Sequence, residues 1–392
     1  MRKALLYFTG FNSTPGGSEY LPLLLAAELQ KTHDVTMALN WDSDVSRTAQ
    51  AVGIPIDANH IKVVVVKPKR KFLAKIDSVL PIFSTHRLKA LARDADICIS
   101  AANIVDFGRP AWHFIYLLRT LGDNAFLDYV RHLPQRSRFS RLRQATRTFL
   151  AEKILRPMLG VRSTRKILAD PRERILPNSY YVESVMREFY GVFNGIMFYP
   201  PTIVEVGDVP DIARNPLKVV YIGQIFPQKR ITDIVAIVER AREISGCDLR
   251  LVIAGHLGRT AYVDAVKALA AHREWVLLVG GVYGDAKKTL LLSATYAIHA
   301  ERDETFGISV TEYLKAGNIV LVPDEGGTPE IVGSQELAYR TDGEAAQMLA
   351  HLLSDETFRE KMRRHCAGRA KTFSRTAYMK RQRKLLDGML KQ

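Results

Sequence analysis

The sequence predicts an α/β protein of two doubly wound, Rossmann-like domains that face each other across a cleft. Three observations lead to this prediction. The chain has 392 residues, which is too long for one ordinary core and suits two domains of under about 200 residues each. Short apolar runs alternate with segments of helical periodicity, a pattern that specifies parallel sheets with right-handed crossovers. The alternation stops at a proline-rich stretch, residues 200–217, and then restarts.

The first alternating block lies in residues 1–205, which we expect to form the N-terminal domain. Its strands are predicted from apolar or β-branched runs that are too short for helices: Lys3–Phe8, Val35–Leu39, Ile61–Val66, Ile97–Ser100 and Trp112–Leu117. Helical periodicity predicts helices over Ser18–Lys31 and Tyr181–Tyr190. Residues 200–217 contain four prolines and few periodic apolar residues, so they are the predicted linker.

The second block, residues 206–375, is expected to form the C-terminal domain. Its predicted strands end at glycine, proline or acidic residues: Lys218–Ile222, Arg250–Ala254, Trp275–Val279, Tyr296–Ala300 and Ile319–Val322. Its predicted helices are Ile231–Ile244, Ala261–Ala271 and Ile308–Ala316. Thr376–Leu390 is basic and amphipathic, and we expect residues 376–392 to form a helix that packs back on the N-terminal domain.

The composition indicates a cytoplasmic globular protein. Hydrophobic residues make up 47% and charged residues 25% of the chain, and no apolar run approaches the roughly 20 residues that span a bilayer. The apolar stretch at the start, Ala4–Phe8, runs into a Gly/Pro-rich loop, which favours a first buried strand over a signal peptide. The three cysteines are far apart and show no metal-ligand spacing, which is typical of a reducing compartment.

The net charge of +15 is concentrated in the first half of the chain. Residues 1–200 carry 29 Lys and Arg against 17 Asp and Glu, whereas the remainder carries 27 against 24. Two windows hold the excess, Lys62–Lys75 with six basic residues and Arg131–Arg174 with 13. A one-sided basic field attracts phosphates, in an anionic membrane, a lipid-linked diphosphate or nucleic acid. A solvated basic face without a dedicated partner is the simpler alternative.

The most specific stretch of the sequence runs from Glu304 to Glu312. Glu304 follows a predicted strand end and precedes the helix that opens at Gly307-Ile308. The N-terminus of a helix offers unpaired N–H groups and a positive dipole end to a phosphate. Glu312 lies about one helical turn inside, and Gly326-Gly327 adds backbone donors. Carboxylates on either side of an anion site suit a ligand with hydroxyls at both ends and phosphate between, which is the layout of a nucleotide sugar.

These residues resemble the signature of a known family. Glu304-Thr-Phe-Gly, Glu312 eight residues later, Ala316-Gly317 and Gly326-Gly-Thr-Pro-Glu-Ile-Val332 are similar to the retaining GT-B glycosyltransferases of the glycogen synthase-like, sucrose synthase-like and mannosyltransferase group, the glycosyl transferases group 1. Weaker likenesses occur in the family's order along most of the chain: Pro15–Glu19, Asn178-Ser179, Phe198–Pro201, Tyr221–Lys229, Ile253–Gly255 and Gly280–Val282.

The resemblance implies that a nucleotide diphosphate sugar binds as co-substrate, mainly on the C-terminal domain, with no cofactor and no metal. It implies that Glu304 binds hydroxyls of the donor sugar, that Glu312 accepts from the ribose, and that Lys229 neutralises the leaving diphosphate. Backbone donors at Gly17 and Phe306-Gly307 would meet phosphate. The implied donor-site residues are Gly17, Gly223, Lys229, Arg230, Gly255, Val282, Glu304, Phe306, Gly307, Ile308 and Glu312.

The chain also departs from the family pattern. Relatives usually carry an Arg beside the lysine, and here Gln224 and Phe226 occupy the candidate positions, which leaves Arg230 as a possible substitute. A catalytic His is often found at the strand here written Trp112–Tyr116. We name His113, together with Glu304 and Lys229, as candidate catalytic residues. The alternative is that His113 is a core histidine and Tyr116 holds the functional position.

The reaction implied is retaining sugar transfer from the donor to a hydroxyl acceptor, without a metal. Asp42-Ser43-Asp44 matches the metal-binding pattern of another glycosyltransferase fold, but it is short and is interpreted as a chance match in a loop, Trp41–Ser46. The basic residues Lys67, Lys69, Arg70 and Lys71 suggest an acceptor at a membrane surface, such as a lipid-linked saccharide or a polysaccharide or lipopolysaccharide precursor. We therefore expect peripheral contact with an anionic membrane at its inner face.

Two alternatives remain open at this stage. One keeps the fold and changes the reaction, to a nucleotide-sugar epimerase or another GT-B enzyme. The other is a non-catalytic basic protein that binds membrane or nucleic acid. Nucleic acid is not expected, because no recognisable module is present and aromatic residues are not interleaved with the basic windows.

Overall fold

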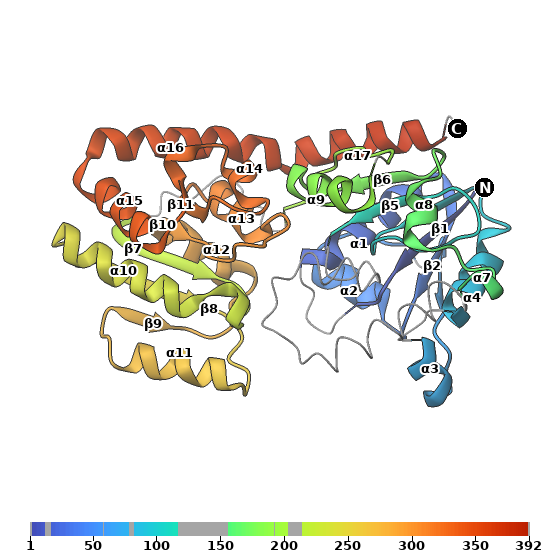
Figure 1. Cartoon of the computed structure of the whole chain (residues 1–392), viewed down its shortest axis with the longest axis horizontal. Coiled ribbons are helices and arrows are strands. Elements are labelled where there is room, and N and C mark those ends of the chain that lie inside the picture. The colour runs from blue at the N-terminus through green and yellow to red at the C-terminus, as the bar shows by residue number, and fades with distance from the viewer. Residues whose placement is uncertain are drawn as a thin grey trace. The chain divides into compact units, whose positions relative to one another are not determined.

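A computed structural model describes residues 2–11, 17–57, 59–77, 82–116, 156–191, 193–202 and 214–390 (Figure 1). The chain forms two compact units, residues 1–200 together with 383–392, and residues 201–382. Each unit contains one six-stranded parallel sheet, so the predicted α/β architecture with two doubly wound sheets is confirmed. The boundary expected between residues 205 and 206 lies outside the described residues, as does most of the predicted linker.

The sheet of the first unit has the strand order β3-β2-β1-β4-β5-β6. Its strands are β1 (Arg2–Phe8), β2 (His33–Leu39), β3 (Ile61–Val65), β4 (Ile97–Ser100), β5 (Trp112–Ile115) and β6 (Arg174–Pro177). Its helices are α1 (Gly17–Leu29), α2 (Val45–Ala51), α3 (Lys71–Asp77), α4 (Ile82–Ala92), α7 (Arg156–Met158), α8 (Thr164–Leu168) and α9 (Tyr180–Tyr190). The order reverses between β1 and β4, the arrangement of a doubly wound fold.

The sheet of the second unit repeats this arrangement, with the order β12-β11-β10-β7-β8-β9. Its strands are β7 (Asn215–Ile222), β8 (Arg250–Ala254), β9 (Val276–Leu278), β10 (Ala294–Ile298), β11 (Ile319–Pro323) and β12 (Ala338–Tyr339). Its helices are α10 (Ile231–Ser245), α11 (Ala261–Ala271), α12 (Gly284–Ser293), α13 (Ile308–Lys315), α14 (Thr328–Val332), α15 (Asp342–Ser354) and α16 (Glu356–Ala370). Every residue of β11 is buried, because helices cover both faces of a doubly wound sheet.

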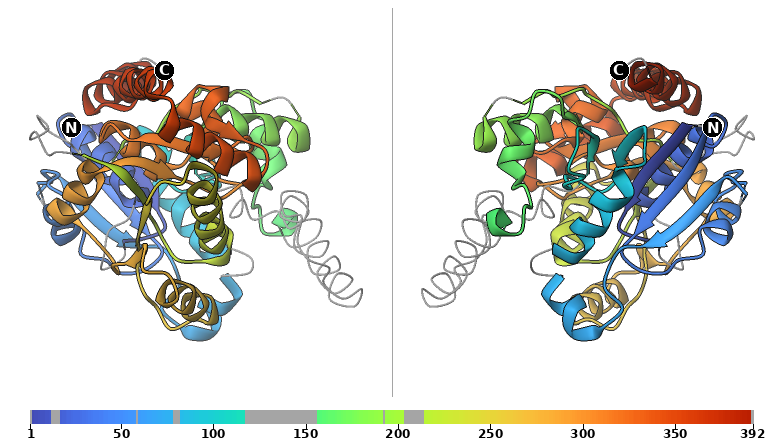
Figure 2. Two further views of the ribbon diagram at one scale, coloured as in Figure 1. Left: turned by 90° about the vertical axis from the view of Figure 1, so that its left-hand side faces the viewer. Right: turned by 90° about the vertical axis from the view of Figure 1, so that its right-hand side faces the viewer.

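The last helix, α17 (Arg375–Leu390), begins in the second unit, and its residues from Arg383 onward group with the first. None of the helices within the described residues is long and apolar enough to cross a membrane. The short helix α3 projects from the rest of the first unit, as both Figure 1 and the side views of Figure 2 show. It directly follows the basic residues Lys67, Lys69 and Arg70.

One loop prediction needs correction. Residues Trp41–Ser46 were expected to form a loop, but α2 begins inside this segment at Val45. Asp44 is the residue that starts it: its side chain accepts a hydrogen bond of 2.9 Å from the backbone N–H of Arg47. Asp44 is therefore an N-cap, which gives the Asp-x-Asp sequence a structural role.

Candidate functional site

Charged side chains gather where β7 and β10 end. These two strands are neighbours in the sheet of the second unit, and the strand order reverses between them. Lys229 ends a short 3-10 turn, Pro227–Lys229, that follows β7, and Glu301 and Glu304 follow β10. Because the carboxyl ends of parallel strands meet at one edge, residues about 70 positions apart come together here. This edge is the usual ligand-binding position of a doubly wound sheet.

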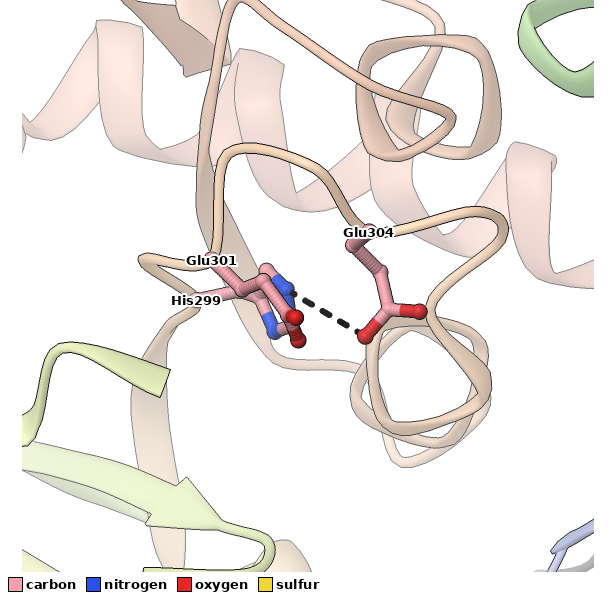
Figure 3. Close-up of side chains that lie close together, drawn as sticks. All are labelled: His299, Glu301 and Glu304. Atoms are coloured by element: carbon pink, nitrogen blue, oxygen red, sulfur yellow. Dashed lines mark ion pairs between the residues drawn. The ribbon is translucent and has the colours of Figure 1, made fainter. Parts of the chain in front are cut away.

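Lys229 lies at the centre of this group. Its Nζ contacts Oε2 of Glu301 and lies 2.7 Å from Oε2 of Glu304. The three side chains are largely buried, with 23%, 11% and 18% of Lys229, Glu301 and Glu304 exposed. Figure 3 shows Glu304 facing Glu301 and His299, whose Nε2 lies 3.8 Å from Oε2 of Glu304. This Nε2 is buried and has no hydrogen-bond partner.

Two factors shift the pKa values in this group: the burial of its side chains and the interactions among its charges. Burial lowers the pKa of Lys229, but the charges of Glu304 and Glu301 outweigh it and raise the pKa overall. Burial also raises the pKa of Glu304, and here Lys229 and His299 prevail and lower it. The pKa of Glu301 is raised, by burial and then by the charge of Glu304. Burial, and then Lys229, lower the pKa of His299 to about 4, so His299 is neutral at pH 7.

His299, Glu301 and Glu304 offer one possible metal-ligand atom each, and these atoms lie within 4.8 Å of one another. One imidazole and two carboxylates are a donor set that suits several divalent metals. The Lys229 ammonium, however, already contacts both carboxylates and supplies the positive charge between them. A metal ion would have to displace it, so the arrangement favours the lysine as the cation of this site.

The second carboxylate of the motif, Glu312, is held by another lysine. Nζ of Lys287, on α12, lies 2.7 Å from both carboxylate oxygens of Glu312. Only 3% of the Glu312 side chain is exposed, and burial raises its pKa although Lys287 opposes the shift. Each carboxylate of the Glu304–Glu312 motif thus has its own lysine. Lys287 was not among the predicted site residues, because no helix was predicted where α12 lies.

The start of α13 is open to an anion. Gly307 precedes the helix with a φ of +87° and brings no side chain to cap it, so the first N–H groups of α13 are available to a ligand. A Cβ at Gly307 would lie 2.8 Å from the Thr328 side chain, which requires glycine here. Phe306 is buried against Phe373, so its backbone rather than its ring is placed for a ligand.

Glycine loops line the same edge of the sheet beyond β7. The N–H of Gly223 donates to the carbonyl oxygen of Ala254 at 3.0 Å, and the N–H of Gly255 donates to the carbonyl oxygen of Gly280 at 2.7 Å. A Cβ at Gly255 would lie 2.2 Å from the Gly223 carbonyl oxygen, so no other residue fits. Val282 follows in the loop after β9 and is half-buried. The structure therefore brings these predicted positions to one edge of the second unit.

Three residues near Lys229 do not have the surroundings expected of residues that bind a phosphate. Arg230, with a φ of +51°, pairs with Asp233 at 2.8 Å and with Asp342 at 2.9 Å, so its guanidinium is already engaged by carboxylates. Gln224 and Phe226, where the resemblance led us to expect an arginine, are both exposed. Arg230 would have to exchange its two partners to stand in for that arginine.

The predicted site residues of the first unit do not form a cluster like the one in the second unit. His113, in β5, is fully buried, and its Nε2 lies 3.0 Å from Oε2 of Glu173. A buried imidazole that pairs with a buried carboxylate is typical of a core histidine, so the burial of His113 favours that alternative. Gly17 is the first residue of α1, and residues 12–16 of its loop lie outside the described residues. Lys69, Arg70 and Lys71 are exposed, and Lys67 is half-buried.

The two doubly wound parallel sheets form the GT-B architecture. Residues 208–373 match the family model of glycosyl transferases group 1. The match contains Lys229, Glu304, Glu312 and the glycine loops. The sequence resemblance to this group is thereby confirmed.

Solved structures share the architecture along the whole chain. The crystal structure of Alr3699/HepE from Anabaena in complex with UDP and glucose is similar with a TM-score of 0.67 and 14% identity, covering 99% of this chain and 100% of that one. WaaG, a glycosyltransferase involved in lipopolysaccharide biosynthesis, is similar with a TM-score of 0.65 and 13% identity, covering 94% and 95%. At this level of identity the likeness shows the fold.

A curated relative matches in sequence over a shorter stretch. The GPI3 subunit of phosphatidylinositol N-acetylglucosaminyltransferase from Saccharomyces cerevisiae is 24% identical over 129 residues. The match covers 32% of this chain and 28% of the relative, little more than a quarter of that protein's length.

Proposed function

We propose that this protein is a retaining glycosyltransferase that moves a sugar from a nucleotide diphosphate sugar to a hydroxyl acceptor. The observation that carries the proposal is the contact of Lys229 with Glu304 beside the open start of α13. A cation and free backbone N–H groups suit a diphosphate, and a carboxylate next to them suits sugar hydroxyls. The bound UDP and glucose of the structurally similar Alr3699/HepE are consistent with such a donor.

The proposed mechanism is electrostatic. The diphosphate lies at the start of α13, and the Lys229 ammonium turns one of its N–H donors toward the leaving phosphate. Negative charge grows on that phosphate as the bond to the sugar breaks, so a preorganised ammonium and helix N-terminus stabilise the transition state more than the ground state. Glu304 accepts hydrogen bonds from the donor sugar, and Glu312 accepts from the ribose.

Retention follows if attack and departure occur on one face of the sugar. The bond from the anomeric carbon to the phosphate oxygen breaks, and a bond to the acceptor oxygen forms. The departing phosphate oxygen takes the proton of the acceptor hydroxyl, so no paired nucleophile and acid are needed, in contrast to retaining glycosidases. The Lys229 ammonium supplies the positive charge, and on this account neither a metal nor a cofactor takes part.

The acceptor is proposed to be a lipid-linked saccharide or a polysaccharide or lipopolysaccharide precursor at a membrane surface, which the protein contacts peripherally. The support comes from the first unit. Exposed Lys69 and Arg70 precede the projecting helix α3, which begins at the exposed Lys71, and 74% of Phe72 in that helix is exposed. Basic side chains beside an exposed aromatic ring are typical of a surface that binds anionic lipid. The structurally similar WaaG is involved in lipopolysaccharide biosynthesis.

Replacing Lys229 tests the function most simply. Lys229→Ala should lower turnover by about 100-fold or more, the usual effect of losing one preorganised donor at a developing charge. Lys267→Ala, which removes a half-exposed lysine from α11 of the same unit, is the matched control and should keep full turnover. Full activity in Lys229→Ala would remove the proposed role. Binding of the nucleotide sugar without transfer to any acceptor would favour an epimerase-type reaction.

A further inference from the structure

The Lys229 ammonium is shared by two carboxylates, and the proposed function uses only one of them. Glu304 belongs to the family motif, whereas Glu301 lies in the loop that follows β10, at the same edge of the sheet. Its Oε2 contacts Nζ of Lys229 just as Oε2 of Glu304 does.

We propose that Glu301 is a second sugar-binding carboxylate, which together with Glu304 binds two neighbouring hydroxyls of the donor sugar. This inference rests on the proposed function and names a further specificity-determining residue for it. The substrate class that it implies is a donor whose sugar has two adjacent free hydroxyls on the side that faces this pair.

Geometry is the first argument. Ligand atoms of Glu301 and Glu304 lie within 4.8 Å of each other, a spacing that two hydroxyls of one sugar ring can bridge. Both side chains keep a small exposed fraction, 11% and 18%, whereas His299 behind them is 2% exposed. Each carboxylate can accept about four hydrogen bonds, so both can hold Lys229 and still accept from hydroxyls.

Charge is the second argument. One carboxylate is enough to neutralise the Lys229 ammonium. A second carboxylate at this buried position adds repulsion between the two negative charges. Burial and the charge of Glu304 raise the pKa of Glu301, which means that its charged form destabilises the folded protein at pH 7. Glu304 has the opposite effect, because Lys229 lowers its pKa despite its burial. A residue kept at a cost in stability is expected to serve binding or catalysis.

Glu301→Gln and Glu304→Gln form a matched pair of variants, since both keep the size of the side chain and one acceptor. The folded-state pKa of Glu301 is raised, so its charge opposes folding at pH 7 and Glu301→Gln should raise the melting temperature. The folded-state pKa of Glu304 is lowered, so its charge favours folding at pH 7 and Glu304→Gln should lower the melting temperature. If Glu301 formed a purely structural ion pair, both variants would instead have a lower melting temperature than wild type.

Binding supplies the decisive measurement. UDP, GDP and ADP, and the glucose donor of each, are titrated by calorimetry into wild type and Glu301→Gln. The quantity compared is the ratio of the Kd of the nucleoside diphosphate to the Kd of its sugar donor, which isolates the contribution of the sugar. We expect this ratio to fall about tenfold in Glu301→Gln, as for a lost hydrogen bond to a charged group, with the Kd of the nucleoside diphosphate unchanged within about threefold.

The outcomes separate the two proposals. Binding of one donor by wild type with the same ratio in Glu301→Gln overturns the inference about Glu301 and leaves the proposed function intact. Absence of binding by wild type with all six compounds overturns the proposed function and this inference with it. A lowered melting temperature of Glu301→Gln with an unchanged ratio assigns Glu301 to structure alone.

Discussion

Glu312 and Lys287 form a buried ion pair between α13 and α12, with Nζ of Lys287 2.7 Å from both carboxylate oxygens. The pair fixes the Glu312 carboxylate at one position inside the second unit. A preorganised acceptor of this kind binds a ribose hydroxyl without first ordering its own side chain. The lysine is therefore a positioning residue for the proposed nucleotide site.

Lys287→Met should destabilise the second unit by about 3 kcal/mol at pH 7, because Glu312 is then a buried charge without a partner. Burial already raises the pKa of Glu312, and the loss of Lys287 raises it further, so the folded variant binds a proton more readily than the unfolded chain. The loss should therefore shrink as the pH falls from 7 toward 5. Urea unfolding at both values checks the sign.

Two control variants sharpen this prediction. Lys288→Met, at the next position of α12, should change stability little, because the ion pair remains. Adding Glu312→Gln to Lys287→Met should recover most of the loss at pH 7, since no charge is left buried. Equal losses of stability in Lys287→Met and Lys288→Met would contradict a stabilising role for the Lys287–Glu312 ion pair.

Gly255→Ala should cost about 2 kcal/mol and abolish nucleotide binding, because the new Cβ would lie 2.2 Å from the Gly223 carbonyl oxygen and push the two loops apart. Gly343→Ala is the matched control. It lies in α15, where a new Cβ would meet only the Thr341 Oγ1 at 3.9 Å, an ordinary contact, so alanine should leave binding intact and stabilise the helix by about 0.5 kcal/mol. Thermal melts with and without nucleotide measure both effects. Normal binding by Gly255→Ala would show that the loops can separate freely.

His113→Ala should lower stability by about 2 kcal/mol, since it removes a buried side chain and a partner of the buried Glu173. Turnover per folded molecule should stay within about threefold of wild type, because a core histidine does not touch substrate. His113→Gln keeps a hydrogen-bonding group and should lose less stability. A fall in turnover of 100-fold with an unchanged melting temperature would restore the catalytic interpretation.

The basic residues around the start of α3 should govern binding to anionic vesicles. Replacing Lys69, Arg70 and Lys71 with alanine should weaken binding to phosphatidylglycerol vesicles at least tenfold at low salt, at about 1 kcal/mol for each charge. The control variant removes three exposed charges from the second unit, Arg240, Arg250 and Lys267. Phe72→Ser should weaken the binding that persists at high salt. An equal loss in the control would mean that net charge alone, and no defined surface, drives the binding.

The sequence predicted most strands of both sheets because their apolar runs end sharply at turn residues. Lys218–Ile222 and Arg250–Ala254 end at Gly223 and Gly255, and both strands lie close to the predicted bounds. Helices were harder to predict where many charged residues leave too few apolar ones to show the helical periodicity. In α16 (Glu356–Ala370) charged residues alternate with few apolar ones, and only Met362 and Cys366 are buried.

The candidate site was predicted as a set of positions but not as a set of contacts. The spacing of Glu304 and Glu312 follows from one helix, so sequence alone could place them. The lysine partners come from elsewhere in the chain, 75 residues away for Glu304 and 25 for Glu312, and no local pattern indicates such pairs. Glu301 lies in the loop that follows β10, and ligands bind at such strand ends, so its position was the available signal for a functional residue.

The central claim, a nucleotide-sugar site on the second unit, is tested most directly by a thermal-shift panel of nucleoside diphosphates and their sugars with wild type and Glu312→Gln side by side. A ligand at about 100 times its Kd adds about 2.7 kcal/mol of stability, which raises the melting temperature by several degrees. We predict that one nucleotide, with its sugars, raises the melting temperature of wild type and has a much smaller effect on Glu312→Gln. No shift of wild type with any compound, or an equal shift of both proteins, would contradict the account.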